Sequence, residues 1–290
     1  MPRISALGTD VAVIVTTYNR PIALAWVLAS LSKQTVMPGA IVVADDGSGE
    51  ETFQVIQDWN DYFSRHHPQI RLIHAWQEDL GFRAAAARNL AVERAKAECN
   101  PKVLVFMDGD CPAPPHFIEN HLALLEPGTM VAGGRGLLTQ TYTKQLEQMV
   151  EKIAPHELVT TLQLFSSPYR LWLSKACDRY LSMCQWTHPI FNRLRDAKPK
   201  DEALVRACNL SLWVSDFDRA SGFDESFVGW GLEDTEFAVR LIAQGVRVRS
   251  GRFATNVFHL WHPERSRSEL QANAVKLDAS RSRFSDVRGG

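Results

Sequence analysis

The chain has 290 residues, and its 32 lysines and arginines against 33 aspartates and glutamates give a formal net charge of −1. Hydrophobic residues make up 45% and charged residues 22%, an ordinary globular composition that excludes a disordered, collagen-like or disulfide-scaffold chain. The balanced charge also removes the broad attraction for polyanions on which non-specific nucleic-acid binding depends, so we expect no nucleic-acid partner.

The first half of the chain alternates short β-branched runs with helix-like stretches. We predict five strands, at residues 11–17, 40–44, 70–75, 103–107 and 129–132. Each segment between them is long enough for a crossover helix, and this alternation is typical of βαβ units around a mainly parallel sheet. We therefore expect an α/β fold with helices on both sides of a central sheet and with ligands bound beyond the carboxyl ends of its strands.

Polar clusters follow three of these strands, at residues 16–19, at residues 45–48 and at Asp108-Gly109-Asp110. Two carboxylates that leave a buried strand together suit Mg²⁺ or Mn²⁺, although Asp and Gly are also common in solvated turns. Two acidic strand ends that face one crevice favour a nucleotide pocket, in which Tyr18 could stack on the base. Arg83 and Arg88 open the next predicted helix, where a cation near a helix N-terminus can face a diphosphate.

Residues 139–200 form a stretch rich in leucine and aromatic residues, which we interpret as a helical insertion. Its helices either pack on the sheet or form an acceptor-binding or membrane-surface element, and the sequence leaves this choice open. The basic residues Arg170, Lys175 and Arg179 lie near Trp172 and Trp186, a combination found in membrane-surface helices.

Two further motifs lie in the last third of the chain. Glu233-Asp234 follows Trp230, and an aromatic face beside a carboxylate suits sugar binding with removal of a hydroxyl proton, although acidic residues also favour any first helical turn. His259 ends an apolar run and His262 follows it, but a His-x-x-His pair alone is not a specific metal signature.

Together these motifs resemble the inverting nucleotide-sugar glycosyltransferases of family 2, which have the Rossmann-like GT-A fold. The matching stretches are residues 16–21, 44–48 and 81–89, together with the DxD motif Asp108-Gly109-Asp110. Residues 222–237 are similar to the catalytic modules of bacterial chondroitin and hyaluronan synthases and, more distantly, to β-1,4-galactosyltransferases. The resemblance covers residues 11–262, and the order of several motifs makes it far more specific than any one of them.

The resemblance implies a role for each matching residue. Thr16, Tyr18 and Asp46 would hold the uridine, in a crevice that Arg88 completes. Asp108 would bind the ribose or the metal's water shell, and Asp110 would bind the metal. His259 would be a further metal ligand, with His262 as the second choice. Asn209 would line the sugar pocket beside Trp230, Asp234 would be the general base, and Glu233 its nearest competitor.

The resemblance further implies a metal-dependent enzyme that uses Mn²⁺ or Mg²⁺. It would transfer a hexose or N-acetylhexosamine from a UDP-sugar to a hydroxyl of a glycan or glycolipid, as in the synthesis of bacterial surface polysaccharides. In one compact catalytic domain, residues 1–138 would be the nucleotide-sugar-binding half, 139–200 the insertion, 201–264 the acceptor and catalytic half, and 265–290 a polar tail. Ala207-Cys208 replaces a Gly-Gly pair that is frequent in such modules, so the donor sugar is left open.

Two rival functions fit the sequence less well. A nucleotidyltransferase would want a glycine-rich phosphate loop after the first strand, and residues 16–19 are not one. A non-catalytic glycan- or nucleotide-binding module would have a decayed site, whereas Asp108, Asp110 and Asp234 are all intact.

The expected location is the cytoplasm, with peripheral contact at the inner membrane surface left open. The five cysteines are odd in number and form no Cys-x-x-Cys pair, which suits a reducing compartment and gives no thiolate zinc site. The apolar run at residues 11–15 is too short to span a membrane and lacks a secretory cleavage pattern.

Overall fold

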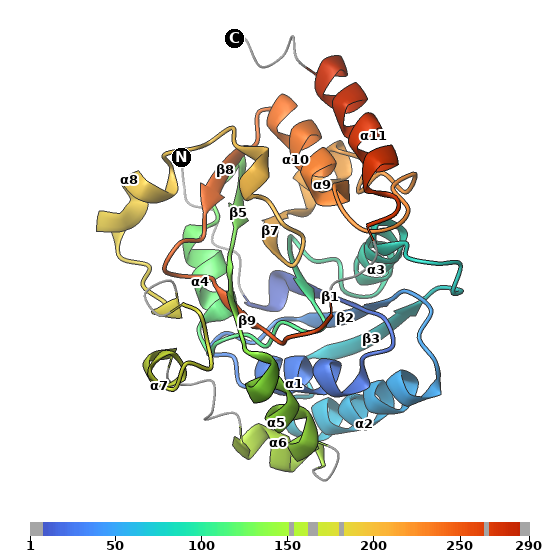
Figure 1. Ribbon diagram of the computed structural model, residues 1–290, viewed down its shortest axis with the longest axis vertical. Helices are drawn as coiled ribbons and strands as arrows, with labels where there is room; N and C mark the ends of the chain where they lie inside the picture. The colour runs from blue at the N-terminus through green and yellow to red at the C-terminus, as the bar shows by residue number, and fades with distance from the viewer. Residues whose placement is uncertain (1–7, 151–153, 162–167, 180–182, 264–266, 285–290) are drawn as a thin grey trace.

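The computed structural model describes residues 8–150, 154–161, 168–179, 183–263 and 267–284. A seven-stranded sheet in the order β3-β2-β1-β4-β7-β5-β8 forms its centre (Figure 1). Its strands are β1 (Val11–Thr17), β2 (Ala40–Asp45), β3 (Arg71–Trp76), β4 (Val103–Asp108), β5 (Thr129–Ala132), β7 (Asn209–Trp213) and β8 (Arg247–Ser250). All five predicted strands are present, with ends that differ from the expected ones by at most one residue. Only β7 runs antiparallel to its neighbours in this sheet, so the expected mainly parallel α/β fold is confirmed.

Both faces of the sheet are covered by helices because its strands are apolar on both sides. Val11, Val13 and Val15 of β1 belong to the core under α1 (Pro21–Leu31), α2 (Glu50–His66) and α4 (Phe117–Leu124). Ala12 and Ile14 point to the opposite face, under α3 (Ala84–Cys99), α9 (Val214–Arg219) and α10 (Glu233–Ala243). Figure 1 shows α1 and α2 on one side of the parallel strands and α3 and α10 on the other.

A second, two-stranded sheet was not predicted. In it β6 (Arg135–Leu137) pairs in parallel with β9 (Val257–His259), so that Leu137 lies opposite His259. The Asn256 side chain accepts a hydrogen bond of 2.8 Å from the backbone N–H of Gly134, which fixes the start of β6. This pairing places the residues around the end of β9, late in the chain, next to the residues that follow β4.

The described part of the insertion at residues 139–200 consists of short helices separated by irregular stretches. It contains α5 (Gln140–Val150), α6 (Pro155–Thr161), α7 (Pro168–Leu173), the 3₁₀ turn η4 (Pro189–Phe191) and α8 (Asn192–Arg195). Leu146 and Leu158 are buried in the same core as α1, and the indole N–H of Trp26 donates to the Leu146 carbonyl. The first part of the insertion therefore packs on the sheet's helices.

The remaining elements are two short turns and one helix. They are the 3₁₀ turns η1 (Gly8–Asp10) and η5 (Glu202–Leu204) and the helix α11 (Leu270–Arg283). The segment expected as a polar tail thus includes a helix, and the buried side chain of Leu277 anchors it beside α10. No helix among the described residues is both long and apolar enough to cross a membrane.

Candidate active site

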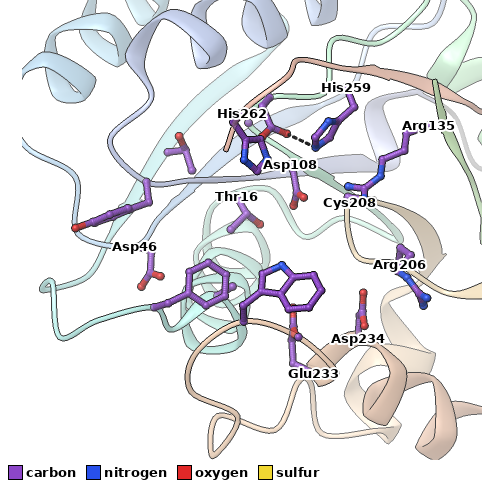
Figure 2. A pocket seen from close by; sticks show the side chains of 18 of the residues that line it. Thr16, Asp46, Asp108, Arg135, Arg206, Cys208, Glu233, Asp234, His259 and His262 are labelled. Atoms are coloured by element: carbon purple, nitrogen blue, oxygen red, sulfur yellow. Dashed lines mark ion pairs between the residues drawn. The ribbon is translucent and has the colours of Figure 1, made fainter. Parts of the chain in front are cut away.

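A cavity of about 560 Å³ lies at the carboxyl ends of β1, β2 and β4, a size ordinary for a small-molecule site (Figure 2). It brings together ten of the eleven candidate residues considered in the sequence. These are Thr16, Tyr18, Asp46, Arg88, Asp108, Asp110, Trp230, Glu233, Asp234 and His259, and His262, named as second choice, also lines it.

Asn209 is the exception. Its side chain is fully buried, and its amide nitrogen donates to the carbonyls of Gly134, at 2.8 Å, and Thr255, at 2.6 Å. Its amide oxygen lies 3.0 Å from Nε2 of His121. Asn209 therefore does not line the cavity in this structure, because its amide is used to hold together the strands behind the cavity; its place in the sugar pocket stays a prediction.

One end of the cavity is formed by Asp46 and Tyr18. The Asp46 carboxylate accepts hydrogen bonds from the backbone N–H of Arg83, at 2.7 Å, and from the Gln77 side chain, at 2.6 Å. Burial nevertheless raises the pKa of Asp46. The Tyr18 hydroxyl donates to Asp79 at 2.8 Å, and this hydrogen bond raises the pKa of Tyr18. These bonds fix the carboxylate and the ring as two walls of a slot.

Arg88 joins three of the elements that form the cavity. Its Nη1 lies 2.9 Å from Oε1 of Glu233 and its Nη2 lies 3.4 Å from Oδ1 of Asp108. Its Nε donates to the Thr16 hydroxyl at 3.1 Å. A buried cation is stable only when its charge and donors are satisfied. Each guanidinium nitrogen has a partner here, so Arg88 cross-links β1, β4 and α10.

Asp110, His259 and His262 bring their ligand atoms within 4.8 Å of one another. Nε2 of His259 is 3.8 Å from Oδ1 of Asp110, and Nε2 of His262 is 3.4 Å from Oδ2. The β6–β9 pairing and a 2.9 Å backbone bond from Leu260 N–H to the Asp110 carbonyl hold this arrangement. One carboxylate and two imidazoles are a donor set that suits Mn²⁺.

The charge states around Asp110 also fit a cation. Burial lowers the pKa of His259 to about 4, which leaves the imidazole neutral and able to bind a metal. Burial alone would raise the pKa of Asp110, but His259, Arg20 and His262 together lower it. Asp108 lies beside this cluster with its carboxylate turned to Arg88, and burial raises its pKa.

Asp234 lies on the other side of the cavity from the histidines, at the start of α10 (Figure 2). Its Oδ2 accepts a hydrogen bond of 3.3 Å from the backbone N–H of Ala207. Burial, with the neighbouring Glu233 carboxylate adding to it, raises the pKa of Asp234 to about 6. Such a carboxylate is ionised at neutral pH and accepts a proton more readily than an ordinary aspartate.

Trp230 lies beside this carboxylate in a loop with unusual backbone geometry. Gly229, Gly231 and Leu232 all have positive φ angles, of 79°, 101° and 78°. Two of these positions are glycine, which adopts this region without strain, whereas the leucine does not. The guanidinium of Arg267 lies 5.1 Å from the centre of the Trp230 ring and covers one of its faces.

Comparison with known proteins decides the family. The sequence model described as glycosyl transferase family 2 matches residues 12–209, more than half of the chain. The chain belongs to this family. A second model, described as the N-terminal domain of galactosyltransferase, matches residues 194–263, the part of this family 2 chain that contains Asp234 and both histidines.

Several characterised proteins are similar to this family 2 chain. A validoxylamine A glucosyltransferase from Streptomyces hygroscopicus subsp. limoneus is 32% identical over 258 residues, which cover 87% of this chain and 52% of the relative. A chondroitin synthase from Escherichia coli is 26% identical, over 86% of this chain and 34% of the relative. The chain therefore spans about half or less of the length of these relatives.

Solved structures agree on the fold. The structure of GalNAc-T7 with UDP, GalNAc and Mn²⁺ has a TM-score of 0.61 at 14% identity, over 95% of this chain and 48% of that one. The mannosyltransferase PcManGT from Pyrobaculum calidifontis, in complex with GDP-Man and Mn²⁺, has a TM-score of 0.53 at 16% identity, over 100% of this chain and 68% of that one. The expected GT-A fold is thus confirmed.

Sequence reasoning missed several residues that line the cavity. Arg20 was noted only as part of a motif, yet its Nη1 lies 2.6 Å from Oδ2 of Asp110. Arg135 and Arg206 were not singled out at all, because isolated arginines carry no periodic or spacing signal. Cys208 was noted only as a departure from a Gly-Gly pair, and it lies in the cavity wall.

Proposed function

We propose that this chain transfers a sugar from a UDP-sugar to a hydroxyl of a glycan or glycolipid, with inversion at the anomeric carbon and with bound Mn²⁺ or Mg²⁺. The observation that carries the proposal is a single cavity with a ready metal-ligand set, Asp110, His259 and His262, on one side and a proton-accepting carboxylate, Asp234, on the other. Membership of family 2 and the sugar-nucleotide complexes of the structural neighbours support the same chemistry.

The donor's nucleoside would lie at the end of the cavity formed by Asp46 and Tyr18. The Asp46 carboxylate can accept from the imide N–H of uracil while it keeps its bonds to Arg83 and Gln77, because each carboxylate oxygen can accept more than one hydrogen bond. The structural neighbours carry either UDP or GDP-mannose, so the preference for uracil rests on this residue. Asp46→Ala should therefore reduce the preference for UDP over GDP.

Asp110, His259 and His262 would hold the ion. The carboxylate suits either Mn²⁺ or Mg²⁺, whereas the two imidazoles favour Mn²⁺ over Mg²⁺. When bound, a divalent cation neutralises negative charge on the departing diphosphate. Arg20 now occupies one oxygen of Asp110, and Glu147 lies 4.0 Å from its Nη2 as an alternative partner. Arg20 can thus release the Asp110 oxygen without being left unpaired.

Asp234 would act as the general base. The acceptor oxygen forms a bond to the anomeric carbon as the bond from that carbon to the diphosphate oxygen breaks, and the acceptor's proton passes to the Asp234 carboxylate. Glu233 is unsuited to this role because its carboxylate is paired with Arg88. Trp230, which is 39% exposed beside Asp234, offers an apolar face to a sugar ring.

Calorimetric titration with UDP, in the presence of Mn²⁺ and in the presence of EDTA, tests the proposal. We expect tight binding only with the metal, and metal-dependent release of UDP when a panel of UDP-sugars is supplied. Equal affinity in EDTA would contradict the metal-bridged site, and no UDP binding in either condition would contradict the proposed function.

We place the acceptor or its carrier on the insertion, because the residues assigned to the donor lie outside residues 139–200. Trp172 and Trp186 are 45% and 47% exposed there, with Arg170, Lys175 and Arg179 near them in the sequence. Aromatic and basic residues together suit the surface of an anionic membrane, so this part of the proposal places the protein at the inner membrane surface, in the cytoplasm. Failure to co-sediment with anionic liposomes would contradict it and favour an acceptor free in solution.

A further inference from the structure

We propose that Arg135 and Arg206 form a subsite for a negatively charged group, a carboxylate or a phosphate, carried by the donor sugar or by the acceptor. This inference rests on the proposed function and adds a substrate class to it. It follows from the charges of the cavity wall and from the place of these two arginines relative to Asp234.

The other arginines of the cavity already have partners. Arg20 is paired with Asp110, Arg88 is paired with Glu233 and Asp108, and Arg267 covers the ring of Trp230. Among the described residues, by contrast, no carboxylate lies within 4.0 Å of the guanidinium of Arg135 or of Arg206. Two guanidinium groups on one part of the cavity wall therefore stand outside any ion pair among the described residues.

These two cations lie close to the reacting end of the cavity. Figure 2 shows Arg135 and Arg206 on the same wall, with Cys208 next to them and Asp234 beside Arg206. Burial raises the pKa of Cys208 to about 12, so the thiol between the arginines is neutral and does not offset their charge. The bond from Ala207 N–H to Asp234 keeps the chain next to Arg206 against the proposed base.

Both arginines are carried by firmly held backbone. Arg135 begins β6, and the preceding Gly134 donates to Asn256 while its carbonyl accepts from Asn209. Nη1 of Arg206 donates to the Val205 carbonyl at 2.7 Å, which leaves its other donors for a ligand. Arg135 is partly buried and Arg206 is exposed at the cavity wall. A planar guanidinium is suited to bind carboxylate or phosphate through two hydrogen bonds.

The anion must belong to the sugar or the acceptor rather than to the nucleoside. The nucleoside end of the cavity is formed by Tyr18 and Asp46, whereas Arg206 lies beside Asp234, where the acceptor hydroxyl must come. Arg135 is near enough to Asp108 and Asp110 for their charges to raise its pKa, so a contact with the diphosphate is the competing role for Arg135 alone.

The test compares charged and neutral probes that are otherwise alike. For the donor we would measure metal-dependent binding and hydrolysis of UDP-glucuronate and UDP-glucose. For the acceptor we would measure binding of p-nitrophenyl β-glucuronide and p-nitrophenyl β-glucoside to the protein loaded with UDP and Mn²⁺. The variants are Arg135→Gln and Arg206→Gln, with Arg206→Lys to retain the charge. Arg247→Gln, which changes an exposed arginine at the start of β8, is the matched control.

We expect the wild-type protein to prefer the charged member of one pair by tenfold or more, the effect of a single charge-assisted hydrogen bond. Each glutamine variant should abolish that preference, Arg206→Lys should retain part of it, and Arg247→Gln all of it. The pair that shows the preference identifies the donor or the acceptor as the carrier of the anion.

Two results would overturn the proposal. One is equal binding of charged and neutral members in both pairs by the wild-type protein. The other is a tenfold loss of affinity for UDP itself in Arg135→Gln, which would assign Arg135 to the diphosphate. Both can be told apart from failure of the proposed function, since that failure appears in a separate titration as no metal-dependent binding of UDP by the wild-type protein.

Discussion

Nη1 of Arg88 lies 2.9 Å from Oε1 of Glu233, and this ion pair separates the roles of two adjacent acidic residues. The side chains of Arg88 and Glu233 are only 6% and 11% exposed, so neither charge could be left alone without a large penalty. Among the described residues, the next side chain, that of Asp234, accepts only from a backbone N–H and from the Thr235 hydroxyl, and its carboxylate stays in the cavity wall. Glu233 therefore holds the site together, while Asp234 is free to exchange a proton.

Asp234→Asn should lower kcat by about 10²–10⁴-fold while the Kd for UDP stays nearly unchanged, because a general base acts only during proton transfer. Glu233→Gln should act differently. It leaves a buried guanidinium without its carboxylate and should destabilise the fold by about 3–5 kcal/mol. Kinetics, UDP titration and thermal melting of both variants distinguish the two roles. Normal turnover in Asp234→Asn together with lost turnover in a stably folded Glu233→Gln would exchange the assignments.

The pH dependence of the reaction should report the raised pKa of Asp234. With a pKa of about 6, the carboxylate is ionised above pH 6 and becomes protonated as the pH falls below it. Since only the ionised form accepts the acceptor's proton, kcat/KM should fall about tenfold per pH unit below that inflection. The matched control is Asp234→Asn, whose residual activity should lack the inflection. An inflection that persists in this variant would assign the titration to another group.

The dependence of UDP binding on Mn²⁺ should require both His259 and His262. His259→Ala and His262→Ala should each raise the Mn²⁺ concentration needed for half-maximal UDP binding by tenfold or more, because each removes one of three converging ligands. Asp110→Ala should remove most of the metal dependence. His116→Ala, which changes an exposed histidine paired with Glu119, is the control and should leave the titration unchanged. An unchanged Mn²⁺ titration in either cavity variant would remove that histidine from the ligand set.

The strands and most of the cavity could be predicted from the sequence because their signals are local. Runs of valine, isoleucine and alanine fix β1, β2 and β4, and polar residues after such strands must meet at one edge of a parallel sheet. β6 gave no such signal. It has three residues, Arg135, Gly136 and Leu137, and its pairing with β9 depends on a partner more than a hundred residues away in the sequence. For the same reason no local pattern places His262 beside Asp110, and the resemblance implies it only as the second choice after His259.

Asn209 is the opposite case. Its position in the motif suggested a contact with the sugar, whereas the fold uses its side chain for internal hydrogen bonds. Its hydrogen-bond partners His121, Gly134 and Thr255 lie 88, 75 and 46 residues away along the chain, so no local pattern could reveal them. Burial lowers the pKa of His121 to about 4, and the neutral ring bonds Asn209 on one side and Ser211 on the other. The amide thereby joins α4, β7 and the segments that lead into β6 and β9.

Asn209→Ala should consequently reduce the stability of the fold more than it reduces ligand binding. The change removes a partner from the buried ring of His121, from the buried Thr255 carbonyl and from the partly buried Gly134 carbonyl. An unsatisfied buried polar group costs about 1–3 kcal/mol. We expect a loss of about 3 kcal/mol in the free energy of unfolding, measured by urea denaturation. Gln57→Ala, on the exposed face of α2, is the control and should change stability by about 0.5 kcal/mol or less.

The effect on ligands follows from where Asn209 lies. The Gly134 carbonyl it holds comes just before Arg135, so Asn209→Ala should loosen β6 and weaken any contact made by that arginine. The slot formed by Asp46 and Tyr18 lies at the other end of the cavity and shares no hydrogen bond with Asn209. UDP affinity, measured at a temperature where the variant stays folded, should therefore change by less than about twofold. A stable Asn209→Ala variant that discriminates poorly between sugars would instead support a role for Asn209 in the sugar pocket.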